Sequence, residues 1–452
     1  MRGYVLRSTQ AFSIDEVVYY RMGTQVAKNW FDYHTIPYAW EKENQGYHFP
    51  EYFFRPLYKH PPLFTFLIAI TMKLFGPHIY SAAGISHIFG VLLILLTYLL
   101  GTLVFNRDVG LISAFFIYID PVTIMTSQKI WPDTTMAFFM VLSVYLFILG
   151  LKKSRDIFFI FSGMAVGLAA LTKYPGILPG IAILLYAALY EADLFKNRIF
   201  RIGYFIIPLS LLAPWFVWNY AVYGLAALTE HAELKVLAGL IQKRSLFLIA
   251  VGGTTWLLYL TGRHKKERLL HFFSKQMDPV QTRKKLKGLS YFLIFLFCGL
   301  FFREHLFRGF QFDFIPETSW VLGFFSREPM YFYFGRLLEF SLMYGLAYIA
   351  LFTYEPHDKK ETLVLRVTTL VILLFFSFWG SYQSRYILSA IPLLMILGGH
   401  FWIKLFNRFY DSQNIYSYIG GCLGLVGFLI FIIFRTLHIN AFLSFSNNMC
   451  YF

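Results

Sequence analysis

An uninterrupted apolar run, SAAGISHIFGVLLILLTYLLGTLV, occupies residues 81–104 and contains no charged side chain. A helix needs about 20 mostly apolar residues to cross a bilayer, and this run is long enough. Together with this run, the clearest apolar runs occupy residues 81–104, 109–127, 134–151, 157–172, 176–190, 203–222, 246–261, 289–303, 332–353, 365–380, 386–404 and 416–434. They predict an all-α, polytopic transmembrane bundle of about 12 spanning helices, with additional interfacial helices on its outer face.

The composition agrees with a multi-pass integral membrane protein. The 452 residues are 57% hydrophobic and 14% charged, whereas soluble domains carry about 25% charged residues. Aromatic residues reach 20%, which suits lipid-facing helices and interfacial belts. The formal net charge is +15. Because the basic residues lie between apolar runs, we expect them to set orientation and attract anionic lipid, and we expect no nucleic-acid partner.

The basic loops all fall on one side of the membrane if the short apolar stretch 62–76 lies at the interface and does not span. The longest of them, residues 263–287, is expected to be cytoplasmic by the positive-inside rule. Residues 1–80 then form an outer-face loop with interfacial helices, and residues 81–452 form the transmembrane domain. This topology starts the chain outside without an upstream helix, and a missing first helix is one explanation. The predicted location is the cell membrane, with the site facing outward.

An acidic pair, Asp15-Glu16, lies in the polar opening segment FSIDEVVYYRMG at residues 12–23. The spacing of its apolar residues predicts a short helix lying on the membrane, with Ser13 as N-cap. One interpretation is structural, because carboxylates in a first turn stabilise the positive end of a helix. The functional interpretation makes Asp15 a general base that removes a proton from an acceptor hydroxyl. Glu16 would then raise the pKa of that base.

A cationic group, Lys59-His60, precedes Pro61-Pro62 and closes the outer loop. Prolines commonly begin helices, and a helix N-terminus beside Lys59 and His60 would attract an anion. The alternative is that Lys59 reaches the lipid headgroups as an interfacial anchor.

Two further polar residues interrupt apolar runs on the same predicted side. Asp133, in Trp131-Pro132-Asp133, is either a helix N-cap or a second carboxylate that binds the acceptor or a divalent metal ion. Lys173 precedes Tyr174-Pro175 and is either a turn lysine or the partner of a phosphate.

Arg385-Tyr386 completes the set of candidate substrate-binding residues. The planar guanidinium of arginine binds two phosphate oxygens at once, although Arg385 could also anchor the outer face. No spacing of residues identifies a metal site, so a divalent metal ion stays open as a cofactor.

Several stretches, in this order, resemble the membrane-embedded glycosyltransferases of the dolichyl-phosphate-mannose protein mannosyltransferase type, to which the bacterial aminoarabinose transferases of lipid A are related. The matching stretches are FSIDEVVYY, YKHPPLFTFLIAITMKLFG, SQKIWPDTTMAFFMVLSVYLF, GLAALTKYPGILPG and SRYILSAIPLLMILGG. The resemblance implies a GT-C fold of the glycosyltransferase family 39 kind, with a cavity open to the outside. It also implies a hexosyl or pentosyl donor linked through phosphate to a polyprenol.

Residue roles follow from the same resemblance. Asp15 matches the acidic residue that acts as base or acceptor ligand, and Glu16 lies beside it. Lys59, His60 and Arg385 fall where contacts to the donor phosphate are expected. Asp133 matches a second outer-face carboxylate. The family's first helix and a soluble acceptor-binding domain are not recognisable, so the sequence does not identify the acceptor.

Two other functions fit parts of the same pattern. A transporter or flippase of lipid-linked sugars would also need intramembrane charges and a cavity that attracts phosphate. A polymerase or ligase of lipid-linked glycans would perform different chemistry on a similar helical body. Transfer of a sugar to a lipid, glycan or protein acceptor is the function we carry forward.

Overall fold

The described part of the chain is helical. The computed structural model describes residues 13–46, 48, 51–54, 60–224, 332–353, 359–377, 383–410 and 415–445. Within these ranges no β-strand is present. All of them belong to one compact unit, Met1–His231 with Met330–Phe452. The predicted runs 246–261 and 289–303 and the predicted basic loop 263–287 lie outside the described residues.

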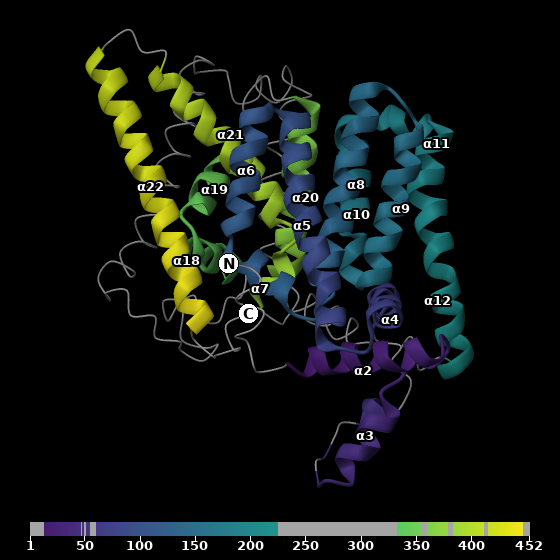
Figure 1. Cartoon of the computed structure of the whole chain (residues 1–452). Coiled ribbons are helices and arrows are strands. Elements are labelled where there is room, and N and C mark those ends of the chain that lie inside the picture. The colour runs from purple at the N-terminus through teal and green to yellow at the C-terminus, as the bar shows by residue number, and fades with distance from the viewer. Residues whose placement is uncertain are drawn as a thin grey trace, which may run out of the picture. The chain divides into compact units, whose positions relative to one another are not determined.

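Most of the long helices stand side by side in Figure 1. Their bounds are α2 Ile14–Lys28, α3 Ile36–Glu43, α4 Leu63–Phe75, α5 Ile79–Val104, α6 Arg107–Ile119, α7 Pro121–Gln128, α8 Asp133–Lys153, α9 Ile157–Thr172, α10 Leu178–Tyr190, α11 Arg198–Arg201, α12 Ile207–Tyr223, α18 Phe332–Phe340, α19 Met343–Phe352, α20 Lys360–Ser377, α21 Ile391–Tyr410 and α22 Ile415–Phe445. Short 3-10 turns η2 (Tyr174–Ile177) and η6 (Ser384–Ile387) precede α10 and α21.

Four described helices are long and apolar enough to cross a membrane: Ile79–Val104, Asp133–Lys153, Arg198–Val222 and Ile419–His438. A fifth span is obtained if α6 and α7 count as one bent crossing. The chain is therefore an integral membrane protein, but the predicted number of about 12 spans is not confirmed. Several predicted runs, such as Ile157–Thr172, form apolar helices that are too short to meet the same criterion.

The predicted span 109–127 is wrong as a continuous helix. The chain bends by 59° between α6 and α7, at Asp120. One carboxylate oxygen of Asp120 accepts hydrogen bonds from the backbone N–H and the hydroxyl of Thr123, both at 2.8 Å, and so caps α7. The other oxygen accepts a hydrogen bond from the Tyr344 hydroxyl at 2.5 Å. The bend delivers the residues after α7 to the end of the unit where α2 lies (Figure 1).

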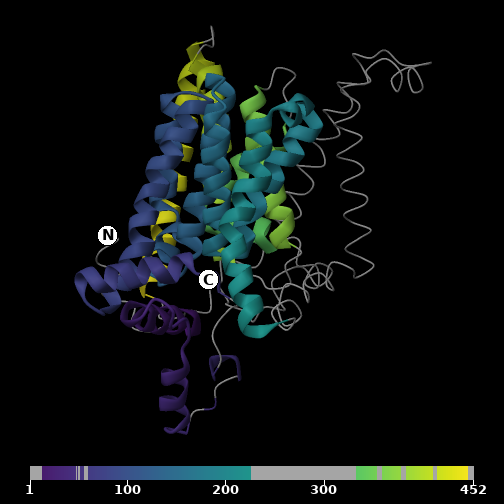
Figure 2. The same cartoon turned by 90° about the vertical axis from the view of Figure 1, so that its right-hand side faces the viewer.

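Two short helices, α2 and α4, cover that end of the unit, and α3 projects beyond them (Figures 1 and 2). Tyr19 and Met22 of α2 pack in one buried cluster with Phe64 and Ile68 of α4. Burying each such side chain contributes about 1.5–3 kcal/mol. A Cβ on Gly23 would come within 2.4 Å of the Ile68 side chain, so only glycine permits this approach of the two helices.

The length of α4 bears on the predicted topology. Its 13 residues extend about 20 Å, less than the hydrocarbon core of about 30 Å. The connections α5–α6, α8–α9 and α10–α11, which carry predicted cytoplasmic basic residues, lie at the end of the unit away from α2 (Figure 1). The assignment of residues 1–80 to the outer face stays a prediction, but the separation of these basic connections from α2 supports it.

Candidate active site

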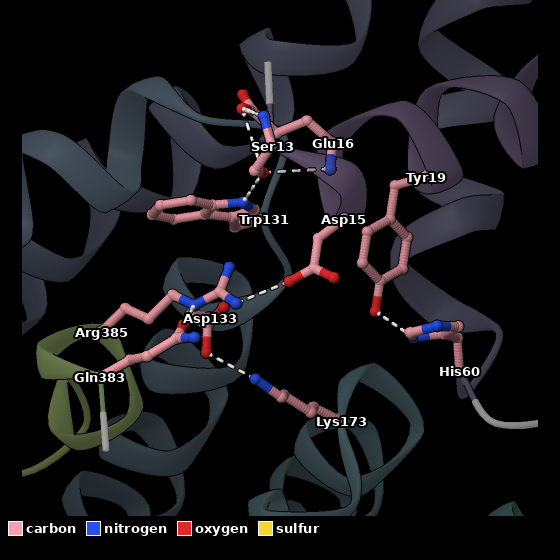
Figure 3. A network of polar contacts seen from close by, with 10 residues as sticks. All are labelled: Ser13, Asp15, Glu16, Tyr19, His60, Trp131, Asp133, Lys173, Gln383 and Arg385. Atoms are coloured by element: carbon pink, nitrogen blue, oxygen red, sulfur yellow. Dashed lines mark hydrogen bonds and ion pairs between the residues drawn. The ribbon is translucent and has the colours of Figure 1, made fainter. Parts of the chain in front are cut away.

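Polar side chains from four segments that are distant in sequence meet at the α2 end of the unit (Figure 3). The segments are the first turn of α2, the residues between α7 and α8, the turn after α9, and η6. They bring together Asp15, Asp133, Lys173 and Arg385, all of which the sequence singles out. Two cations and two carboxylates therefore form the centre of the candidate site.

The N-terminus of α2 is a capping box, which confirms Ser13 as the predicted N-cap. The backbone N–H of Ser13 donates to Oε2 of Glu16 at 2.9 Å, and Glu16 N–H donates to the Ser13 hydroxyl oxygen at 3.4 Å. Two N–H groups without helical partners are satisfied in this way. The carboxylates of Glu16 and Asp15 point to different sides of this turn (Figure 3).

Asp15 forms an ion pair with Arg385 across 370 residues of sequence. A guanidinium nitrogen of Arg385 lies 2.6 Å from Oδ2 of Asp15. The arginine side chain is 7% exposed and the aspartate side chain 43% exposed. Nε of Arg385 also donates to the Gln383 side-chain oxygen at 2.6 Å, and the guanidinium carbon lies 4.2 Å from the centre of the Trp131 ring. These contacts orient the guanidinium, and the Asp15 carboxylate stays accessible to a ligand.

The Asp15–Arg385 pair is charged on both sides. Burial alone would raise the pKa of the Asp15 carboxyl, but the Arg385 guanidinium, with smaller effects from His60 and Lys173, outweighs burial and lowers the pKa. Burial would likewise lower the pKa of Arg385, but Asp133 and Asp15 raise it above its ordinary value. At neutral pH, Asp15 is therefore a carboxylate able to accept a proton.

Asp133 forms the second ion pair. Its Oδ1 accepts a hydrogen bond from Nζ of Lys173 at 2.8 Å, and the aspartate side chain is fully buried. The ammonium of Lys173 lies 4.5 Å from the centre of the Tyr386 ring, a cation–π contact. Gly176 allows the turn after Lys173 to fold against α9, because a Cβ there would meet the Ala169 carbonyl at 2.2 Å.

The structural interpretation of Asp133 as a helix N-cap is wrong. Pro132 occupies the N-cap position of α8, and no side chain caps this end. Asp133 is the first helical residue, and its carboxylate faces Lys173. Its second oxygen, Oδ2, is buried and has no hydrogen-bond partner among the described residues. A buried carboxylate oxygen without a partner is unfavourable, so this atom offers an acceptor to a ligand.

His60 lies beside the site through Tyr19. The Tyr19 hydroxyl and Nδ1 of His60 are 3.0 Å apart, and the Tyr33 hydroxyl donates to the His60 carbonyl oxygen at 2.7 Å. Pro62 precedes α4 as its N-cap residue. Lys59 lies outside the described residues, so its predicted phosphate contact stays a prediction.

Sequence reasoning missed some residues that support the site. Tyr19 is four residues after Asp15, a spacing that places both on one face of a helix. The pattern Ser13-x-x-Glu16 is a capping-box signature and assigns Glu16 a structural contact. The contact of Trp131 with Arg385 had no local signal, because it joins residues 254 positions apart along the chain.

Metal ligands do not gather in the described ranges. No group of three histidine, cysteine, aspartate or glutamate residues suited to hold a metal ion occurs there. The divalent metal ion left open by the sequence therefore has no candidate ligand set within those ranges, and we assign no chemical step to it.

A family model matches part of the chain. Residues 59–218 match the family described as dolichyl-phosphate-mannose-protein mannosyltransferase. A protein of Aquifex aeolicus (strain VF5) without an assigned function is 24% identical over 169 residues. That match covers 36% of this chain and 33% of the relative, so the chain matches about a third of the relative's length.

Solved structures match nearly the whole chain. ArnT from Cupriavidus metallidurans, bound to undecaprenyl phosphate, superposes with a TM-score of 0.55 at 15% identity, covering 98% of this chain and 73% of ArnT. The oligosaccharyltransferase AglB from Archaeoglobus fulgidus, in complex with an inhibitory peptide and a dolichol-phosphate, gives 0.56 at 17% identity and covers 97% and 53%. The chain thus has the GT-C fold of these proteins, and its residues 59–218 carry the sequence pattern of the dolichyl-phosphate-mannose-protein mannosyltransferase family.

Proposed function

We propose that the protein is a glycosyltransferase that moves a sugar from a polyprenyl-phosphate donor to an acceptor at the outer face of the membrane. The convergence of Asp15, Arg385, Asp133 and Lys173 at one end of the helical unit carries this proposal. A half-exposed carboxylate next to the buried Arg385 and the partly exposed Lys173 suits a base placed beside a site that binds an anion. The GT-C fold and the family match support the same function.

The cations suit the phosphate of the donor. Arg385 and Lys173 come from η6 and from the turn after α9, and both contact Tyr386 as well as a carboxylate. An arginine binds two phosphate oxygens at once, and a lysine adds a point charge. The related folds of ArnT and AglB hold undecaprenyl phosphate and dolichol-phosphate, which supports a polyprenyl phosphate here.

Both cations are paired with carboxylates in the described state, so a donor phosphate has to compete for them. When the phosphate takes over the guanidinium of Arg385, Asp15 loses the neighbour that lowers its pKa. The pKa of Asp15 then rises and its carboxylate becomes a stronger base. Donor binding and base activation are coupled in this way.

The proposed reaction is a direct displacement. Asp15 accepts the proton of the acceptor hydroxyl while the acceptor oxygen forms a bond to the anomeric carbon of the sugar. The bond between that carbon and the phosphate oxygen breaks, and its electron pair leaves with the polyprenyl phosphate. Arg385 and Lys173 stabilise the charge that develops on this leaving group. The anomeric configuration is inverted.

Placement at the outer face of the cell membrane is part of the proposal. The separation of the site from the basic α5–α6, α8–α9 and α10–α11 connections supports it, because basic loops favour the cytoplasmic side (Figure 1). The identity of the sugar and of the acceptor follows from neither the fold nor the charges.

A reconstituted system tests the proposal. Purified protein in liposomes receives radiolabelled undecaprenyl-phosphate sugars together with lipid, glycan and protein acceptors. We expect the label to leave the polyprenyl phosphate with the wild type and with Asp108→Asn, an exposed residue of α6. Asp15→Asn should not release it. Label that crosses the bilayer while still attached to its lipid would instead indicate the transporter or flippase.

A further inference from the structure

Glu16 directly follows the candidate base, yet its carboxylate contacts other groups. The residue is 2% exposed, and its Oε2 accepts hydrogen bonds from the backbone N–H of Ser13 at 2.9 Å and from the Ser13 hydroxyl at 3.2 Å. Its Oε1 accepts a hydrogen bond from the backbone N–H of Ile130 at 3.2 Å. One carboxylate thus joins the first turn of α2 to the segment between α7 and α8.

Trp131 makes a second connection between the same two segments. Its indole N–H donates to the Ser13 hydroxyl oxygen at 2.9 Å, and its carbonyl oxygen accepts from the Ser86 hydroxyl at 3.0 Å. The guanidinium of Arg385 lies 4.2 Å from the centre of the same indole ring. The segment between α7 and α8 therefore contacts both the start of α2 and Arg385, the cation that pairs with Asp15.

Lys129 adds a charge to this connection. Its ammonium lies 3.7 Å from Oε2 of Glu16, and the two side chains are 4% and 3% exposed. Burial lowers the pKa of Lys129 and the Glu16 carboxylate opposes that effect. A buried carboxylate held by two backbone N–H groups and an ammonium is fixed in place.

We propose that Glu16 is a positioning residue that fastens the first turn of α2 to residues 129–131 and thereby holds Asp15 against Arg385. We call the contacts among Ser13, Glu16, Ile130 and Trp131 the latch. The inference rests on the proposed role of Asp15 as the base. In this inference Glu16 acts by holding Asp15 in position, and not by raising the pKa of Asp15 as a neighbouring negative charge.

The two roles of Glu16 predict opposite signs for one measurable quantity. If Glu16 acts on Asp15 only as a neighbouring negative charge, Glu16→Gln lowers the pKa of Asp15. If Glu16 acts through the latch, Glu16→Gln loosens the contact of Asp15 with Arg385, and the pKa of Asp15 rises. Glutamine has one oxygen in place of two, so it cannot accept from both Ser13 and Ile130.

The other ionisable groups around Asp15 are the same in both cases. Arg385 of η6, His60 before α4, Lys173 after α9 and Tyr19 of α2 act on Asp15 directly. Asp133 of α8 acts on Arg385 and Tyr19, and Lys129 before α8 pairs with Glu16. None of them is changed by the substitution at Glu16. The direction in which the pKa of Asp15 shifts therefore distinguishes the two roles of Glu16, the latch and the neighbouring charge.

Carbodiimide labelling measures this titration without any substrate. The reagent modifies protonated carboxyl groups, and Asp15 is 43% exposed. Wild type, Glu16→Gln and the matched control Glu41→Gln, an exposed residue of α3, are labelled in lipid nanodiscs across a pH series. Mass spectrometry of the peptide that contains Asp15 gives the pH of half-maximal labelling.

We expect Glu16→Gln to move that pH upward and Glu41→Gln to leave it unchanged. A downward shift or no shift in Glu16→Gln would overturn the latch. If Glu16→Gln does not insert, Ser13→Ala decides, because it removes the Trp131 contact without changing any charge. Ser13→Ala should raise the pH of half-maximal labelling, and an unchanged value would contradict the proposal. Because the labelling experiment measures no sugar transfer, its result tests the role of Glu16 even if the protein proves not to be a glycosyltransferase.

Discussion

Ion pairs occur at both ends of the described helices, but their surroundings differ. At the α2 end, Arg385 and Asp15 meet across 370 residues, and the arginine side chain is 7% exposed. At the opposite end, Lys196 and Asp193 are three residues apart at 2.8 Å, with side chains 84% and 88% exposed. The first pair is held by tertiary structure, and the second forms locally in water.

The difference indicates which charges serve a ligand. An exposed pair adds little to stability, because water screens the attraction and ordering two long side chains costs entropy. A buried pair loses hydration, which its attraction does not always offset. Buried charges are therefore expected where they have another use. Here the buried, unpartnered oxygen of Asp133 and the half-exposed carboxylate of Asp15 are acceptors for such a ligand.

The largest expected effect is that of Asp15→Asn on sugar transfer. Asparagine keeps the size of the side chain but cannot accept the proton, and a positioned base contributes about 10²–10⁴-fold in rate. Turnover with undecaprenyl-phosphate sugars should fall by that factor, whereas Asp193→Asn should leave it unchanged. Near-normal turnover of correctly inserted Asp15→Asn protein would remove Asp15 from the mechanism.

A smaller loss is expected from changing the phosphate contacts. Arg385→Lys keeps the charge but loses the planar group that binds two oxygens. We expect binding of undecaprenyl phosphate to weaken by about 1.5–3 kcal/mol, the range for hydrogen bonds to charged groups. Lys173→Ala should weaken it too, and the double variant should lose less than the sum if both residues bind one phosphate. Unchanged affinity in the double variant would place the phosphate elsewhere.

Undecaprenyl phosphate should also change the titration of Asp15. Arg385 lowers the pKa of this carboxyl, so the pair stabilises the fold above the ordinary pKa of about 3.9 and loses that contribution as pH falls through the lowered value. A phosphate that takes Arg385 should therefore raise the pH at which carbodiimide labels half of Asp15. Asp193, labelled in the same sample, provides the reference, and a shift common to both residues would count against a specific exchange.

The smallest effect is expected at the opposite end. Lys196→Ala breaks the exposed pair with Asp193, and neither the melting temperature in nanodiscs nor sugar transfer should change measurably. A large loss of sugar transfer in this variant would show that the degree of exposure does not distinguish functional ion pairs from other surface pairs.

The sequence predicted the helical membrane fold, and it singled out four residues that the structure brings together, but it did not predict which of them pair. Asp133, Lys173 and Arg385 interrupt or precede apolar runs, and Asp15 belongs to an acidic pair in the polar opening segment; both are local signals. Their pairing depends on how distant helices pack, and no local pattern encodes the choice of partner. Asp133 illustrates this. Its place before an apolar run predicts a helix N-cap, but in the structure Pro132 is the N-cap residue and the Asp133 carboxylate pairs with Lys173.

The positions at which helices break were also hard to predict. Residues 109–127 are mostly apolar and Asp120 is their only charged residue, so hydrophobicity alone favours one span. At the bend, Pro121 follows Asp120, and Thr123 and Tyr344 satisfy the Asp120 carboxylate; Tyr344 is 224 residues away. The functional predictions for Glu16, His60 and Tyr386 stay predictions, and the capping box indicates how Glu16 can act through structure.

A structure of the protein with undecaprenyl phosphate, determined by cryo-electron microscopy in nanodiscs, tests the central claim most directly. We predict that the phosphate lies within hydrogen-bonding distance of both Arg385 and Lys173, with the polyprenyl chain in the lipid. The Oδ2 atom of Asp15 should then no longer be within 2.6 Å of the guanidinium. A phosphate bound away from both cations, with the Asp15–Arg385 and Asp133–Lys173 pairs intact, would contradict the proposed site.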